Sequence, residues 1–152
     1  MPTTDLAAHL AAHLAAHLAA TAPESSVPAA LRTWFAIHFV ADLLFAIPLF
    51  VAPHATLHGL FGWETVDPIS TRLVAAALFG IGIESWLGRT NGVEGFRTML
   101  TLMVIWATTA WTGILWSLLE HGGRPAAGWL FFGVFVTFGG VWSYWRWRLR
   151  AN

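Results

Sequence analysis

The chain has 152 residues, of which 57% are hydrophobic and only 11% are charged. Soluble domains carry about 25% charged residues, so most of this surface must face something other than water. Eight arginines, no lysines and eight acidic residues give a formal net charge of zero. This balance argues against a nucleic-acid partner, which would require a basic face. The absence of cysteine excludes disulfides, thiolate nucleophiles and cysteine-ligated metal centres.

Residues 1–31 form an arm and linker in which the sequence AAHL occurs three times. On a helix, His9, His13 and His17 would form one stripe, because they recur every four residues. Such a stripe could bind a metal ion or sense pH. We favour a second interpretation, in which a low-complexity expansion forms an alanine-rich helix at a membrane interface, because repetition at this fidelity is typical of sequence slippage.

Residues 32–150 contain four apolar runs, each close to the ~20 residues that cross a hydrocarbon core. These runs cover residues 34–52, 69–87, 98–119 and 125–145. Backbone polar groups cannot stay unpaired in lipid, so each run must be a helix, and short loops make neighbouring helices antiparallel. The sequence therefore predicts an all-α fold, an integral membrane four-helix bundle with a short N-terminal helix.

The arginines orient this bundle, because cytoplasmic loops carry an excess of basic residues. Two arginines, Arg72 and Arg124, fall on one side of the predicted membrane. The other six fall on the side of both termini: Arg32, Arg89, Arg97, Arg146, Arg148 and Arg150. The sequence therefore predicts a multi-pass protein with cytoplasmic N- and C-termini.

Polar residues inside the predicted spans are the main candidate site. Asp42 lies at the middle of the first span, and a charge there costs ~2.5–3.5 kcal/mol on insertion scales. His38 precedes it by one helical turn, and counting ~1.5 Å per residue from the span midpoints places Glu84 at the depth of His38. The same count places Thr108 and Thr137 at the depth of Asp42. We therefore expect a buried cluster of His38, Asp42, Glu84, Thr108 and Thr137.

Two interpretations of this cluster stay open. It could be a proton path or a socket for the head group of a small ligand, since acid and histidine series are typical of proton relays. It could equally be a lock between helices, in which the polar groups only hydrogen-bond one another. The predicted chain of polar groups reaches only halfway across the membrane, which suits a binding socket better than a channel.

Other residues give weaker indications of a bound metal ion, haem, quinone or lipid. His54, His58 and His121 fall on the outer side, where they could share a metal ion, although their spacing matches no recognised metal motif. Haem is disfavoured, because a bis-histidine site needs facing intramembrane histidines and only His38 lies within a span. The many tryptophans could line an aromatic pocket for a quinone or a lipid.

The stretch DPISTRLVAAALFGIGIESWLG, residues 67–88, resembles the second-helix region of DoxX-like small bacterial membrane proteins. Arg72, Gly80 and Gly82 match an arginine near the start of that helix and a glycine pair late in it. The resemblance extends loosely over residues 32–147. It implies a four-helix protein of the bacterial inner membrane, and some members of the family are linked with quinone-dependent oxidoreductase complexes.

We therefore expect a non-catalytic subunit or a small-ligand-binding membrane protein that works as a homo-oligomer or within a membrane complex. The alternatives are a proton-coupled transporter or channel formed by several copies, and a quinone-linked redox subunit. No nucleophile–base pair, phosphate loop or cofactor fingerprint occurs in the chain.

Overall fold

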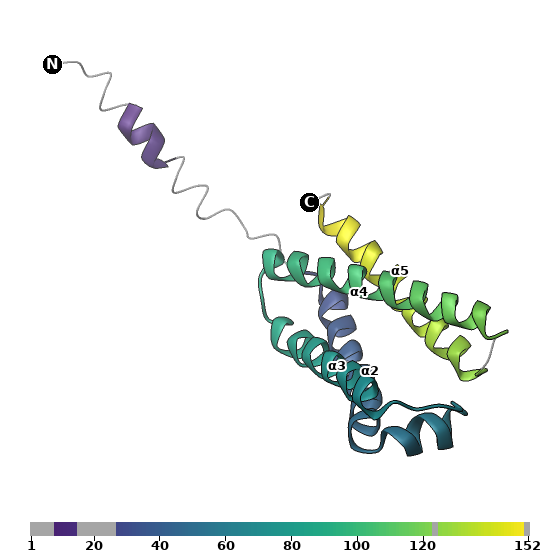
Figure 1. The fold of residues 1–152 in the computed structure, drawn as a ribbon. Coiled ribbons are helices and arrows are strands. Elements are labelled where there is room, and N and C mark those ends of the chain that lie inside the picture. Colours follow the sequence, from purple (N-terminus) through teal and green to yellow (C-terminus); the bar gives the residue numbers. More distant parts are fainter. Residues whose placement is uncertain (1–7, 15–26, 123–124, 151–152) are drawn as a thin grey trace.

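The computed structural model describes residues 8–14, 27–122 and 125–150, and these residues contain helices and no strand. The predicted all-α class is confirmed. Residues 8–14 form a short helix on which His9 and His13 are exposed, while His17 lies outside the described residues. The main elements are α2 (Ala29–Val51), the π-helix η1 (Ala55–Leu60), α3 (Pro68–Gly88), α4 (Val93–Glu120) and α5 (Ala127–Arg150) (Figure 1).

Three of the long helices, α2, α4 and α5, are long and apolar enough to cross a membrane. The sequence analysis predicted a fourth span over residues 69–87, but α3 does not reach the hydropathy of the other three. Arg72 and Glu84 both lie within α3 and lower its hydropathy. The long helices also extend beyond the predicted apolar runs, most clearly where α4 begins at Val93.

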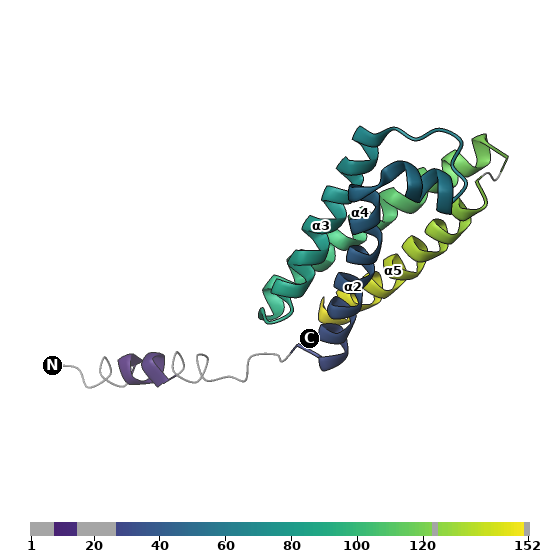
Figure 2. The ribbon, with the colours of Figure 1, turned by 90° about the horizontal axis from the view of Figure 1, so that it is seen from below.

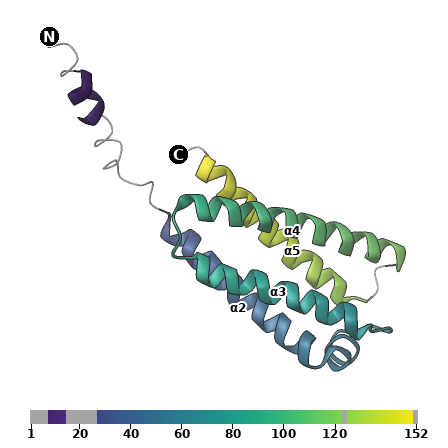
Figure 3. The same ribbon diagram turned by 60° about the vertical axis from the view of Figure 1, so that its left-hand side comes forward.

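The helices α2 and α3 pack side by side along two seams of buried residues (Figure 3). Buried positions recur every three or four residues, which is the spacing of one helix face. The seam of α3 includes small side chains, and small residues let two helix backbones approach closely. The buried residues of α3 are Thr71, Ala75, Leu78, Gly82, Ser85 and Gly88. Those of α2 are Leu31, Phe35, His38, Asp42, Ala46 and Leu49, of which Leu31 and Phe35 belong to a core shared with α4 and α5.

The two helices approach each other closely at Gly82. A Cβ atom placed on Gly82 would lie 2.8 Å from the Cβ of Asp42 and 3.2 Å from its Oδ2. Distances below 3.0 Å between such atoms require the backbone or a rigid part of a side chain to shift. Glycine at position 82 is therefore what lets α3 lie directly against the acidic residue of α2.

The helices α4 and α5 form a second pair (Figures 1 and 2). An aromatic core joins the two pairs near the start of α2. Phe35 of α2 lies at the centre of this core. Its ring centroid is 4.6 Å from that of Phe96 on α4 and 5.5 Å from that of Trp142 on α5. All three side chains are almost fully buried, so this end of the molecule is tightly closed.

Toward the other end, the α2–α3 pair and the α4–α5 pair lie further apart (Figure 3). A smaller core of Ala46, Leu49, Ala75 and Leu78 lies between α2 and α3 alone. The Asp67 carboxylate then caps α3, because the side chain of Ser70 and the backbone N–H groups of Ile69 and Ser70 donate to it. These hydrogen bonds, that of the Ser70 side chain first, hold the pKa of Asp67 below its usual range.

We expect Gly82→Ala to destabilise the protein by about 1–3 kcal/mol, because the added methyl group overpacks the contact with Asp42. Thermal unfolding in a mild detergent measures the change. Gly80→Ala is the matched control, since it lies one half-turn away on the same helix with no atom within 4 Å of the added Cβ. There alanine improves helix propensity by about 0.5–1 kcal/mol. Equal melting temperatures for the two variants would contradict the packing described here.

Candidate functional site

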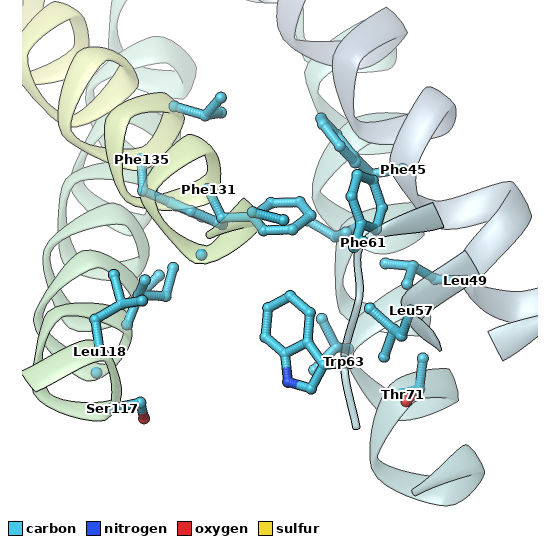
Figure 4. Close-up of a pocket in the computed structure, with 18 of the residues that line it drawn as sticks. Phe45, Leu49, Leu57, Phe61, Trp63, Thr71, Ser117, Leu118, Phe131 and Phe135 are labelled. Carbon is cyan, nitrogen blue, oxygen red and sulfur yellow. The ribbon is translucent and has the colours of Figure 1, made fainter. Parts of the chain in front are cut away.

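A pocket of about 1270 Å³ lies between the α2–α3 pair and the α4–α5 pair. Figure 4 shows its aromatic lining, with Phe45 on α2, Phe61 and Trp63 after η1, and Phe131 and Phe135 on α5. The ring centroid of Phe131 lies 5.4 Å from that of Phe45 and 5.0 Å from that of Phe61. The lining is therefore mostly apolar, with side chains from both helix pairs facing one another.

Two of the polar residues that line this pocket, His38 and Asp42, are buried. The side chains are each only 9% exposed, and His38 Nδ1 lies 3.4 Å from Asp42 Oδ2. This is an ion-pair distance, but the two groups are not aligned as a hydrogen bond, so Asp42 Oδ2 has no hydrogen-bond partner within the described part of the chain. The structure thus brings His38 and Asp42 together, as their spacing predicted.

Ser85 of α3 fixes the orientation of the His38 ring. Its hydroxyl donates to the carbonyl of Ile81 at 2.7 Å, which uses the only proton on that oxygen. The 3.2 Å contact between Ser85 Oγ and His38 Nδ1 must then be a hydrogen bond in which Nδ1–H donates. A neutral His38 consequently carries its proton on Nδ1 and has an acceptor lone pair on Nε2.

Two aromatic rings of α5 hold the other side of the imidazole. The His38 ring centroid lies 5.0 Å from that of Phe138 and 5.1 Å from that of Trp142, both in edge-to-face geometry. Such contacts are worth about 0.5–1.5 kcal/mol beyond the area that they bury. His38 is therefore fixed between α3 and α5, at the closed end of the pocket.

The predicted cluster differs from the observed one in three members. Glu84 is exposed, and its neighbour Ser85 occupies the position facing His38. Thr108 and Thr137 are also exposed, and the Thr137 hydroxyl donates to the carbonyl of Gly133 on its own helix. The structure does not bring these three residues to Asp42. The prediction rested on depth along a span, and depth does not specify which side of the helix a residue occupies.

The outer histidines do not form the three-residue metal site considered from the sequence. No group of three or more metal-ligating side chains occurs among residues 8–14, 27–122 and 125–150. The His54 and His58 rings do lie together, with centroids 5.0 Å apart. However, Nδ1 of His58 forms a hydrogen bond with the backbone carbonyl of Trp63 at 2.8 Å. Nδ1 of His121 likewise forms one with the backbone carbonyl of Ser117 at 2.7 Å. A site that uses His9, His13 and His17 stays a prediction, because His17 is not described.

The sequence analysis suggested an aromatic pocket, but Ser85 and the position of the pocket between the two helix pairs were not predicted. The small residues Ala75, Gly82, Ser85 and Gly88 follow the three-and-four spacing of a packed face, and this signal could have placed Ser85 rather than Glu84 beside α2. The pocket depends on how far apart the two helix pairs lie, which no local sequence pattern specifies. In comparisons with known proteins, no protein family, curated protein or solved structure matches the chain.

We expect a double-mutant cycle between His38→Phe and Ser85→Ala to give a coupling energy of about 0.6 kcal/mol, the average for interhelical hydrogen bonds in membranes. Unfolding free energies of the two single variants and the double variant supply the value. Glu84→Ala replaces Ser85→Ala in a control cycle, because Glu84 is exposed. A coupling of His38 to Glu84 instead of to Ser85 would refute the arrangement described above.

Proposed function

We propose that this protein is an integral membrane protein that binds an apolar molecule in the pocket between its two helix pairs. The observation that carries the proposal is a pocket of about 1270 Å³ with an aromatic lining and one polar pair, His38 and Asp42, deep inside it. Small-molecule sites are typically concave and mostly apolar, with a few placed polar groups. This pocket exceeds the usual ~300–1,000 Å³, so it has room for a long or branched hydrocarbon.

We further propose that α3 crosses the membrane with the other three helices, as an antiparallel partner of α2. At one end, Arg32 near the start of α2 donates to the carbonyl of Arg89 just after α3. At the other end, Nε of Arg72 donates to the carbonyl of Phe50 near the end of α2, at 3.2 Å. Because α3 is paired with the apolar helix α2 at both ends, we expect the two helices to cross the bilayer together.

The same reasoning supports an antiparallel α4–α5 pair. Arg97 near the start of α4 donates to the carbonyl of Leu149 near the end of α5, at 2.7 Å. Leu118 near the end of α4 packs against Gly128 at the start of α5. Six of the eight arginines then fall on the side of the chain termini, so we place both termini in the cytoplasm of a bacterial cell, with the helices in its inner membrane.

We favour ligand binding over proton transport. A proton path needs a chain of polar groups across the membrane, and Glu84, the expected continuation from His38, is exposed on the surface of α3. A quinone-linked redox subunit would use the same pocket, so the identity of the bound molecule separates that alternative from simple binding. Assembly into a homo-oligomer or a larger complex, and membership of the DoxX-like family, stay predictions.

We expect Gly113→Phe to abolish binding of a long-chain isoprenoid alcohol, because Gly113 lines the pocket and the new ring would fill it. Native mass spectrometry of the protein in mild detergent with added farnesol measures the bound fraction. We expect one farnesol per chain in the wild-type protein and a loss of at least about tenfold in affinity in the variant, which corresponds to 1.4 kcal/mol.

Gly133→Phe is the matched control for this experiment. Like Gly113, Gly133 is an exposed helical glycine with no atom within 4 Å of an added Cβ, but it does not line the pocket. The control variant should bind farnesol as the wild type does. Equal binding by Gly113→Phe and Gly133→Phe would show that farnesol binds elsewhere on the helices.

A further inference from the structure

We infer that the molecule bound in this pocket carries a hydroxyl group, which hydrogen-bonds to His38 and Asp42 at the closed end while an apolar tail extends toward Phe61 and Trp63. This inference rests on the proposed function, because it assigns the chemical class of the ligand for the same pocket. It follows from the hydrogen bonds that the protein leaves unmade at the closed end.

Asp42 is the first unsatisfied group. Its side chain is nine-tenths buried and lines the pocket, yet its Oδ2 makes no hydrogen bond within the described part of the chain. Oδ2 lies in the interface with α3, 3.2 Å from where a Cβ of residue 82 would be. A buried polar group without a partner costs about 1–3 kcal/mol, which a ligand can recover by supplying the missing hydrogen bond.

His38 is the second unsatisfied group. Its Nδ1–H is directed to Ser85, with Asp42 Oδ2 at 3.4 Å from the same nitrogen. Nε2 therefore has an acceptor lone pair, and it makes no hydrogen bond to any described residue. The contacts with Phe138 and Trp142 prevent the ring from turning freely to find another partner.

A hydroxyl group fits these two positions better than other head groups. It can donate its one proton to Nε2 of His38 while its oxygen accepts the proton of a protonated Asp42 carboxyl group. A carbonyl or ether oxygen can only accept, so it leaves Nε2 unsatisfied. An anionic head group would meet the acidic Asp42, and no arginine among the described residues lines the pocket. The large aromatic remainder of the pocket then suits a hydrocarbon tail.

The test is a competition between farnesol and farnesyl methyl ether for the full-length protein, read by native mass spectrometry. The two probes share one tail and differ by one methylene in mass, so a single spectrum gives the ratio of the two complexes. The ether carries a methyl group in place of the hydroxyl proton, so it can accept a hydrogen bond but cannot donate one. We expect the wild-type protein to prefer the alcohol by on the order of tenfold, because the ether leaves the polar pair without a donor.

Variants then test whether His38 and Asp42 cause the preference for the alcohol over the ether. His38→Phe combined with Asp42→Leu should bind both probes equally, whereas Glu64→Leu should keep the wild-type ratio. Glu64 is the matched control, because it is an acidic residue that also lines the pocket but is exposed. The wild-type ratio is informative even where the double variant fails to fold.

Three other outcomes would each overturn a part of the proposal. Equal binding of alcohol and ether to the wild type would overturn the inference about the hydroxyl group and leave the proposed function standing. An unchanged preference in the folded double variant would overturn the assignment to His38 and Asp42. Failure of both probes to bind the wild-type protein would remove the proposed function together with the inference.

Discussion

The structure depends on the close contact between α2 and α3, where Gly82 lies directly against Asp42. A Cβ at position 82 would come within 2.8 Å of the Cβ of Asp42, so any larger residue would push the two helices apart. Because the helices approach so closely, Ser85 reaches His38 and holds its ring by a hydrogen bond at 3.2 Å. One small residue therefore permits both the burial of the acid and the orientation of the histidine.

The pocket follows from an uneven distribution of large side chains along the helices. Phe35, Phe96 and Trp142 close one end by aromatic packing, and this core joins α2 to both α4 and α5. At the other end, the core of Ala46, Leu49, Ala75 and Leu78 joins only α2 and α3. The two pairs can then separate, and aromatic side chains such as Phe131 line the resulting space without filling it. His38 lies where the closed end meets the pocket.

The sequence predicted much of the helical architecture, because apolar runs long enough to cross a membrane have few other solutions. The contact between His38 and Asp42 was also predictable, since residues four apart on a helix share one face. The residues of other helices that contact this pair were not predictable in the same way. Glu84 and Ser85 lie at almost the same depth but point about 100° apart around the helix axis. Depth alone therefore led to the prediction of Glu84 as the neighbour of His38, whereas the packed face of α3 places Ser85 there.

The place of α3 beside α2 shows a similar limit of local reasoning. Its own hydropathy falls below that of α2, α4 and α5, because it contains Arg72 and Glu84. Its place beside α2 comes from tertiary packing through Ala75, Gly82 and Ser85, which hydropathy does not measure. The pocket likewise arises from the relative position of two helix pairs, so it became visible only in the folded chain.

The central claim is that the space between the two helix pairs binds an apolar molecule within a membrane. The most direct test is photolabelling of the protein in lipid vesicles with an isoprenoid alcohol that carries a diazirine in its tail, followed by peptide mapping. The account predicts labels on residues that line the pocket, such as Phe45, Phe131 and Val134. Labels confined to exposed residues outside the pocket, such as Leu44, Leu73 and Val136, would contradict it.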